Sequence, residues 1–259
     1  MSSRSRALAI CSVLVVALLA VAAFAPLPFS LAQPGLTTNV LGANRGKPVI
    51  TVAGADSRAT SGELRMTTIA ATGPDASVRL GDLVENWFAT DRAVMPRDSV
   101  YPAGDSTREI ERHNAAQMKA SQDTATEAAL GYLHESADEV RVKLRLADVG
   151  GPSAGLMFSL GIVDKLDGDG SGGDLTGGRT IAGTGTISKS GAVGAVGGVP
   201  LKTQAAGRDG ATVFLVPKQE CSDARAELPK GLRLIPVSTL SSAVDALKAL
   251  EAGGKVPSC

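Results

Sequence analysis

The first pattern along the chain is an uncharged, mostly apolar stretch over residues 7–25, preceded by Arg4 and Arg6. A bilayer span takes roughly 20 apolar residues, whereas the core of a cleaved signal peptide has about 7–15. This length predicts a membrane anchor over residues 1–32, with a signal segment cleaved before secretion as the alternative. The two arginines favour a cytoplasmic N-terminus, so we expect the rest of the chain outside the cell membrane.

Beyond this segment the pattern changes twice before residue 139. Residues 33–47 are rich in Pro, Gly and Asn and lack an apolar period, which predicts a linker. Residues 48–138 then form a predicted ancillary region. Its β-branched runs predict strands, and its longer periodic stretches predict helices, the second one polar and rich in alanine. These elements are expected at residues 49–52, 62–71, 81–98 and 105–134.

Residues 139–259 carry the clearest alternation of strand and helix patterns. Residues 140–146 alternate strictly between apolar and basic side chains, which predicts a half-buried strand. Residues 153–166 are apolar nearly all round, which predicts a buried helix. Further strands are expected at 180–187, 212–216 and 232–237, and a last helix at 241–252. The order of elements predicts an α/β (α+β) fold for this domain.

The charge and the cysteines of the chain indicate which partners and which cellular compartment to expect. The 26 basic and 26 acidic residues cancel, so nothing global favours nucleic acid as a partner. Cys11 lies inside the apolar stretch, which leaves Cys221 and Cys259 as the pair outside the membrane. We expect them to form a disulfide, with two free thiols as the alternative. Closing this loop would stabilise the fold by about 3–4 kcal/mol.

A candidate nucleophile lies between the predicted strand and the buried helix. Gly151-Pro152-Ser153-Ala154-Gly155 fits G-x-S-x-G, which presents a serine on a sharp turn that opens a helix. Gly151, Pro152 and Ala154 are then candidates for the backbone that faces the oxyanion or the substrate. A Gly-Pro turn with a capping serine is the structural alternative.

The base for this serine cannot be a histidine in the order that α/β-hydrolases use. His113 and His134, the only histidines, both precede Ser153, so an esterase of that type would lack its base. A neutral lysine is the recognised alternative. Lys202 follows Pro200 in the first turn of a predicted helix, where the helix dipole and apolar neighbours disfavour its ammonium form.

At these residues the chain resembles the proteolytic domain of Lon proteases. GPSAG is followed 49 residues later by the lysine of GTGTISKSGAVGAVGGVPLKTQAA, and ATVFLVPK continues the similarity. The resemblance implies Ser153 as nucleophile, Lys202 as general base and Thr184 as the residue that steers the lysine. It also implies α+β architecture over about residues 140–250, a protein or peptide substrate, and a homo-oligomer, commonly a hexamer.

The chain departs from the Lon pattern at several points. Gly150 and Thr186 stand where Lon typically has acidic residues. No P-loop occurs, since residues 42–47 have the wrong spacing, so we expect neither nucleotide nor other cofactor. Residues 167–174 are similar to the start of a calcium loop, but Gly178 occupies the twelfth position, which favours a solvated turn and no metal.

The N-terminal anchor and residues 48–124, including Asp91-Arg92-Ala93-Val94-Met95-Pro96-Arg97, resemble actinobacterial membrane-anchored Lon-like proteins, which usually carry a PDZ domain. Too few residues separate the polar helix from residue 140 for a PDZ domain here. The sequence therefore predicts an ATP-independent, extracytoplasmic serine endopeptidase. The alternative is an inactive, anchored scaffold with a Lon-like fold, with residues 105–134 as its docking surface.

Overall fold

The structure, a computed structural model, describes residues 3–101, 106–146 and 151–259 and divides into two compact units. The first unit comprises Met1–Gln33 and Ala71–Glu109, and the second comprises Pro34–Ala70 and Ile110–Cys259. The second unit therefore contains the predicted proteolytic domain together with residues 34–70 and 110–138. Gly150, one of the departures from the Lon pattern, lies outside the described residues.

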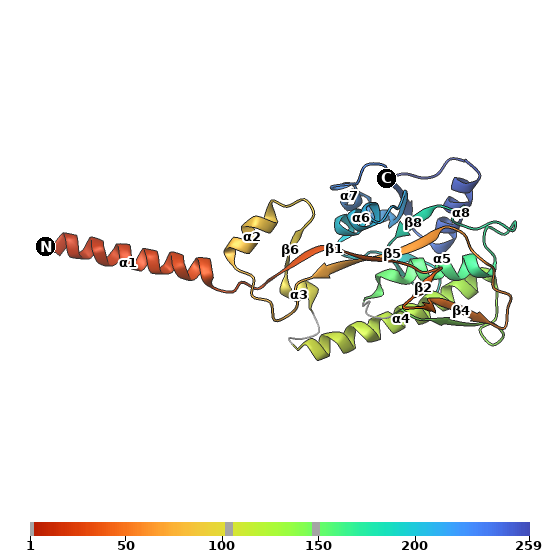
Figure 1. Ribbon diagram of the computed structural model, residues 1–259, viewed down its shortest axis with the longest axis horizontal. Helices are drawn as coiled ribbons and strands as arrows, with labels where there is room; N and C mark the ends of the chain where they lie inside the picture. The colour runs from red at the N-terminus through yellow and green to blue at the C-terminus, as the bar shows by residue number, and fades with distance from the viewer. Residues whose placement is uncertain (1–2, 102–105, 147–150) are drawn as a thin grey trace. The chain divides into compact units, whose positions relative to one another are not determined.

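The first unit begins with the helix α1 (Ser3–Phe24), drawn in red in Figure 1. It has 22 residues, a mean hydropathy of 2.9 and no buried residue, so by length and composition it fits either a membrane span or a signal segment. The start of β1 (Phe29–Asn39) then pairs antiparallel with β6 (Ala93–Pro96). Two short helices complete the unit, α2 (Leu80–Trp87) and α3 (Arg97–Val100).

Two segments differ from the sequence expectation. Residues 33–47, predicted as a linker, form most of β1 and the hairpin of β2 (Ala43–Asn44) and β3 (Lys47–Pro48). Residues 81–98, predicted as one helix, contain α2, β6 and part of α3. The strands β1 and β6 form by pairing between segments far apart in the chain, and local side-chain patterns do not encode such pairing.

The second unit is built on a sheet with the strand order β12-β11-β8-β5-β1. The pairs β12–β11, β11–β8 and β8–β5 are parallel. Parallel strands buried on both faces read as nearly continuous apolar runs, as in Val213-Phe214-Leu215-Val216. The strands are β5 (Glu63–Ala71), β8 (Thr180–Gly183), β11 (Val213–Pro217) and β12 (Arg233–Val237).

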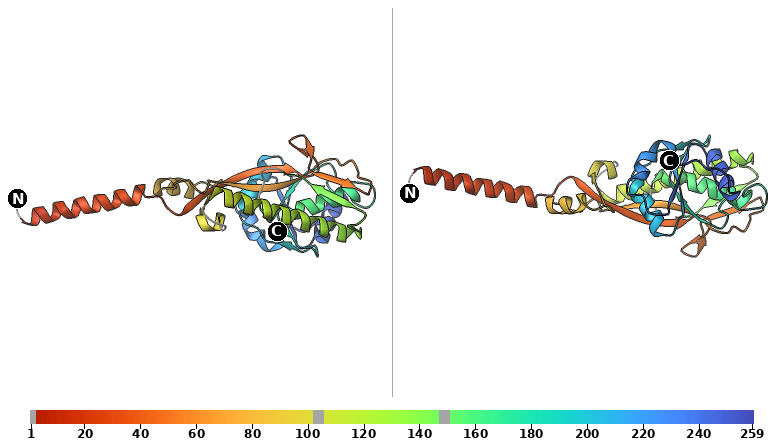
Figure 2. Two further views of the ribbon diagram at one scale, coloured as in Figure 1. Left: turned by 90° about the horizontal axis from the view of Figure 1, so that it is seen from below. Right: turned by 90° about the horizontal axis from the view of Figure 1, so that it is seen from above.

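Helices cover both faces of this sheet, in agreement with the predicted α/β class (Figures 1 and 2). Val213 and Leu215 belong to the larger core, which includes residues of α4 (Thr107–Leu133), α5 (Gly155–Leu166) and α8 (Leu240–Glu251). Phe214 and Val216, which point the other way, belong to a second core with residues of α6 (Val199–Arg208) and α7 (Cys221–Arg225).

Small residues let α4 approach α5 closely at Ala125. Ala125, Ala128 and Ala129 are buried in α4, and Ser159 Oγ of α5 donates a hydrogen bond to Ala125 O at 3.1 Å. The remaining elements are short: β4 (Ile50–Ala53) paired with β7 (Arg141–Leu144), β9 (Thr186–Ile187) paired with β10 (Val193–Gly194), and the 3₁₀ turns η1 (Pro152–Ala154) and η2 (Lys218–Glu220).

The disulfide predicted between Cys221 and Cys259 is present and confirms that expectation. Their Cα atoms lie 5.3 Å apart, and the bond closes a sequence separation of 38 residues. Both cysteines pack against the second core, so the last residue of the chain is attached to α7. Cys11 is free and exposed in α1.

Candidate active site

Ser153 lies in the 3₁₀ turn η1, directly before the buried helix α5. Gly151 precedes this turn with φ +93°, a conformation that side chains with a Cβ rarely adopt. Gly155 follows it, and a Cβ there would lie 2.9 Å from Ile187 Cγ2. The two glycines of G-x-S-x-G therefore allow the sharp turn and the close approach of α5 to β9. The Ser153 residue itself is half-buried.

The end of β8 is bound directly to the backbone of the serine turn. Gly185 N donates a hydrogen bond to Ser153 O at 2.9 Å, and Thr184 Oγ1 donates to the same oxygen at 3.3 Å. In return, Leu156 N donates to Gly185 O at 3.1 Å. These contacts join residues about 30 positions apart and place the Thr184 hydroxyl beside the predicted nucleophile.

Lys202 reaches the same hydroxyl from α6. Gly198 begins this helix with φ +70°, and Pro200 lies in its first turn. Lys202 is 3% exposed, and its Nζ donates a hydrogen bond to Thr184 Oγ1 at 3.2 Å. Thr184 thus connects the Lys202 amine to the backbone of Ser153. Among the described residues there is no direct hydrogen bond between Lys202 Nζ and Ser153 Oγ.

The surroundings of Lys202 favour its neutral form. Burial lowers the pKa of Lys202 to about 8, and the negative charge of Glu220 partly opposes this effect. Removing an ammonium group from water destabilises its charge, which is the main cause here. A lysine with such a pKa is neutral in a useful fraction of molecules near neutral pH, as a general base requires.

Glu220 is a buried group near the site that the sequence did not reveal. It lies in η2 and is 9% exposed. Its Oε1 accepts a hydrogen bond from Val196 N at 3.0 Å, whereas its Oε2 is buried without a hydrogen-bond partner among the described residues. Burial raises the pKa of the Glu220 carboxyl, and the charge of Lys202 counteracts this. Its proximity to Lys202 comes from folding, since no motif links the two.

The other predicted site residues shape the turn in different ways. Pro152 has no N–H, and its carbonyl oxygen accepts hydrogen bonds from Gly155 N and from Ser121 Oγ, the latter at 3.1 Å. Ala154 is 1% exposed and belongs to the larger core. Gly151 is the residue whose backbone conformation sets the direction of the turn. Backbone amides of this turn remain candidates for contact with an oxyanion.

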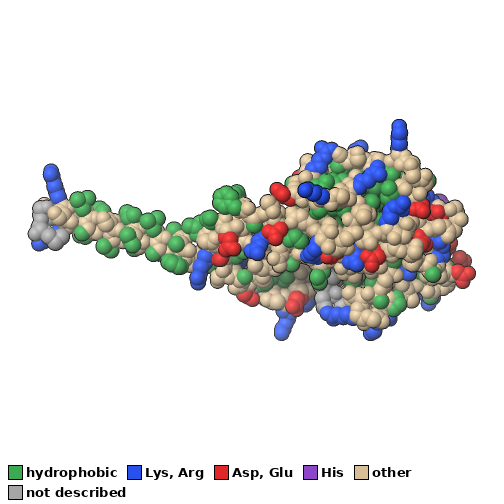
Figure 3. Space-filling view, turned by 45° about the horizontal axis from the view of Figure 1, so that its top comes forward, with side chains coloured by type: hydrophobic (Ala, Val, Ile, Leu, Met, Phe, Trp, Pro, Cys, Tyr) green, Lys and Arg blue, Asp and Glu red, His purple; other side chains and the backbone are tan. Residues whose placement is uncertain are grey.

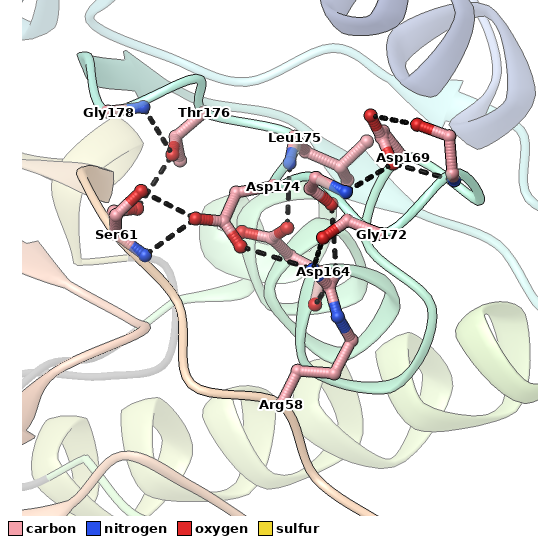
Figure 4. Close-up of polar contacts among 11 residues, drawn as sticks. Arg58, Ser61, Asp164, Asp169, Gly172, Asp174, Leu175, Thr176 and Gly178 are labelled. Carbon is pink, nitrogen blue, oxygen red and sulfur yellow. Dashed lines mark hydrogen bonds and ion pairs between the residues drawn. The ribbon is translucent and has the colours of Figure 1, made fainter.

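The loop that is similar to a calcium site is organised around an arginine (Figure 4). The Arg58 guanidinium donates hydrogen bonds to Gly172 O at 2.7 Å and Gly173 O at 2.9 Å, and it lies 3.6 Å from Asp174 Oδ1. Asp169 accepts hydrogen bonds from within the loop. In the described ranges, no cluster of three or more His, Cys, Asp or Glu side chains is arranged to hold a metal ion.

Beneath this loop lies Asp164, a fully buried acid of α5. Its Oδ1 accepts a hydrogen bond from Leu175 N at 2.7 Å, and its Oδ2 has no hydrogen-bond partner within the described part of the chain. Burial raises the pKa of Asp164 to about 6. This residue belongs to the loop contacts of Figure 4 and is not among the contacts of Ser153, Thr184 and Lys202.

Comparison with protein families identifies this part of the chain. The Lon protease (S16) C-terminal proteolytic domain matches residues 114–249, which is 136 of the 259 residues. The match begins within α4, ends within α8, and includes Ser153, Thr184 and Lys202. The chain therefore belongs to the family of the Lon protease (S16) C-terminal proteolytic domain, a family of serine proteases.

Proposed function

We propose that this protein is an ATP-independent serine endopeptidase that uses Ser153 as nucleophile and Lys202 as general base. The main supporting observation is the buried Lys202 amine, hydrogen-bonded to Thr184 Oγ1 while Thr184 is itself bonded to the Ser153 backbone. Burying a lysine destabilises the folded chain, and residues with such perturbed pKa values cluster at functional sites. Membership of a serine protease family supplies the reaction class.

In the proposed reaction, neutral Lys202 takes the proton of Ser153 Oγ as that oxygen attacks the carbonyl carbon of a peptide bond. Backbone amides of the serine turn stabilise the negative charge that develops on the carbonyl oxygen. The Lys202 ammonium then gives its proton to the departing amine, and the acyl-enzyme remains on Ser153. Water attacks the carbonyl carbon of this ester while Lys202 takes its proton. The bond to Ser153 Oγ then breaks, the proton passes from Lys202 to Oγ, and the second product leaves as a carboxylic acid.

Thr184 has a positioning role in this scheme. Its hydroxyl accepts from Lys202 Nζ and donates to Ser153 O, so both of its hydrogen-bonding functions are used. The contact restricts the rotamers of a long side chain that otherwise has many. Since Lys202 Nζ has to move from Thr184 toward Ser153 Oγ to take the proton, we expect the direct contact to form when substrate is bound.

The N-terminal segment supports a proposal for where the protein lies in the cell. We propose that α1 spans the cell membrane and that the proteolytic domain lies on the extracytoplasmic side. Arg4 and Arg6 precede the apolar stretch, and the Cys221–Cys259 disulfide is suited to an oxidising compartment. The secreted alternative would require cleavage after α1. Resistance of the full chain to alkaline carbonate extraction from membranes would support the anchored form, and release would contradict it.

The decisive experiment for activity is cleavage of casein by the full chain in detergent or vesicles without ATP. We expect cleavage by the parent, no cleavage by Ser153→Ala or Lys202→Ala, and no change when magnesium and ATP are added. Ser241→Ala and Lys119→Ala are matched controls, since both residues are exposed and their side chains bond within their own helices, to Asp245 and Asp123. If the parent, the controls and the site variants are equally inert, an anchored scaffold with a Lon-like fold is the better explanation.

A further inference from the structure

The short helix α2 of the first unit exposes an apolar stripe that the peptidase mechanism does not use. Leu80, Val84, Trp87 and Phe88 are 43%, 53%, 72% and 81% exposed. Their spacing of four, seven and eight residues places them on one face of the helix. Asn86, on the opposite face, is buried and donates a hydrogen bond to Asp82 O at 2.7 Å. The side of α2 that carries Asn86 therefore faces protein, and its apolar side faces outward.

This stripe lies next to the predicted membrane span within the same unit. Helices α1 and α2 contact each other. Leu27, three residues after the end of α1, donates a backbone hydrogen bond to Val78 O at 2.8 Å, and α2 begins two residues after Val78. Figure 3 shows hydrophobic side chains along α1 and again on the adjoining part of this unit.

The distances fit the depth of a membrane surface. Three extended residues reach at most about 10–11 Å, which limits the distance from the end of α1 to Leu27, and the contact between α1 and α2 keeps α2 itself near the apolar helix. The polar headgroup layer of a bilayer is roughly 5–8 Å thick on each side. An amphipathic helix in this layer buries its apolar face about 5–10 Å deep, and tryptophan is enriched at this level. The stripe on α2 combines an apolar helix face with a tryptophan, and it lies next to the end of the predicted membrane span.

We propose that α2 lies in the outer surface of the membrane with Leu80, Val84, Trp87 and Phe88 inserted among the lipids. This inference rests on the proposed anchoring by α1. The charged side chains over residues 75–98 comprise five acidic and three basic residues, so anionic lipid is not the attraction. Burial of apolar area supplies the affinity, and insertion should be the same in neutral and in anionic vesicles.

Trp87 makes the test direct, because the chain contains one tryptophan. The full chain is reconstituted into phosphatidylcholine vesicles, with or without phosphatidylglycerol, and Trp87 fluorescence is measured with brominated lipids and with iodide. We expect strong quenching by bromine on the lipid chains near the headgroups and weak quenching by iodide, in both lipid mixtures. Val84→Glu with Phe88→Glu should increase iodide quenching severalfold, whereas Leu36→Glu, an exposed residue on β1 of the second unit, should not.

Three results would overturn the inference, and they differ in whether they also contradict the anchoring of the chain by α1. Strong iodide quenching in the parent would place Trp87 in water. Protection from both iodide and brominated lipid would mean that protein, such as a second copy, covers the stripe. In both cases vesicle flotation still shows the chain bound, so the anchoring proposal survives. A chain that does not float with the vesicles would instead contradict the anchoring proposal and this inference together.

Discussion

The pH dependence of peptide cleavage should report the pKa of Lys202. With a pKa of about 8, the neutral fraction of Lys202 is about one tenth at pH 7, about half at pH 8 and about nine tenths at pH 9. A general base acts only in its neutral form. We therefore expect kcat/KM to rise about tenfold from pH 7 to pH 9 and then to level off.

The assay is cleavage of an internally quenched peptide by the full chain between pH 6 and pH 10, at substrate concentrations well below KM. An unperturbed lysine, with a pKa near 10.4, would give about a hundredfold rise from pH 7 to pH 9 with no plateau. Such a rise, or a flat profile, would refute the conclusion that burial of Lys202 prepares it as the base.

Glu220→Gln tests the electrostatic part of the same reasoning. The Glu220 carboxylate raises the pKa of Lys202 against the effect of burial. Glutamine keeps an oxygen that accepts from Val196 N but removes the charge. The midpoint of the profile should move to lower pH, so activity at pH 7 should increase relative to the parent. Asp223→Asn, the same change of charge at an exposed residue of α7 that is not among the charges acting on Lys202, should leave the midpoint unchanged.

Three further predictions concern Thr184, Asp164 and the disulfide. Thr184→Val removes the hydroxyl between Lys202 and the serine turn and should lower kcat about 10–100-fold with little change in KM. The control is Thr67→Val, since Thr67 is an equally buried threonine bonded to Gly183 O, and this variant should retain activity. Equal losses in the two variants would refute a positioning role for Thr184. Asp164→Asn should increase the free energy of unfolding by about 2 kcal/mol more at pH 8 than at pH 4.5. The raised pKa of this carboxyl destabilises the folded state increasingly as pH rises from the unfolded pKa of 3.8 to about 6, and the effect is constant above that. Denaturant unfolding with no pH dependence in this difference would contradict the prediction. Replacing Cys221 and Cys259 with serine should lower the free energy of unfolding by about 3–4 kcal/mol. Unfolding in urea, followed by far-ultraviolet circular dichroism, measures this change. An unchanged urea midpoint would mean that the disulfide does not stabilise the fold.

Local sequence patterns were sufficient to predict many of the helices and strands of the proteolytic domain. The apolar residues 153–166 predicted a buried helix, and α5 is almost entirely buried because it has apolar side chains on all sides. The runs at β11 and β12 and the final helix also agree with their predicted positions within one or two residues. The similarity to the Lon family followed from short motifs, and the disulfide between Cys221 and Cys259 followed from the number and positions of the cysteines. Both predictions are confirmed.

Other features depend on contacts between residues far apart in the chain. Residues 33–47 form strands because they pair with other strands, and Glu220 lies near Lys202 because β11 and α6 pack in one core. The sequence predicted Ser153, Thr184 and Lys202 as site residues. The Thr184 hydroxyl connects the other two only in the folded chain. Side-chain periodicity records which face of an element is buried, whereas the pKa of a buried amine depends on all the groups that folding brings around it.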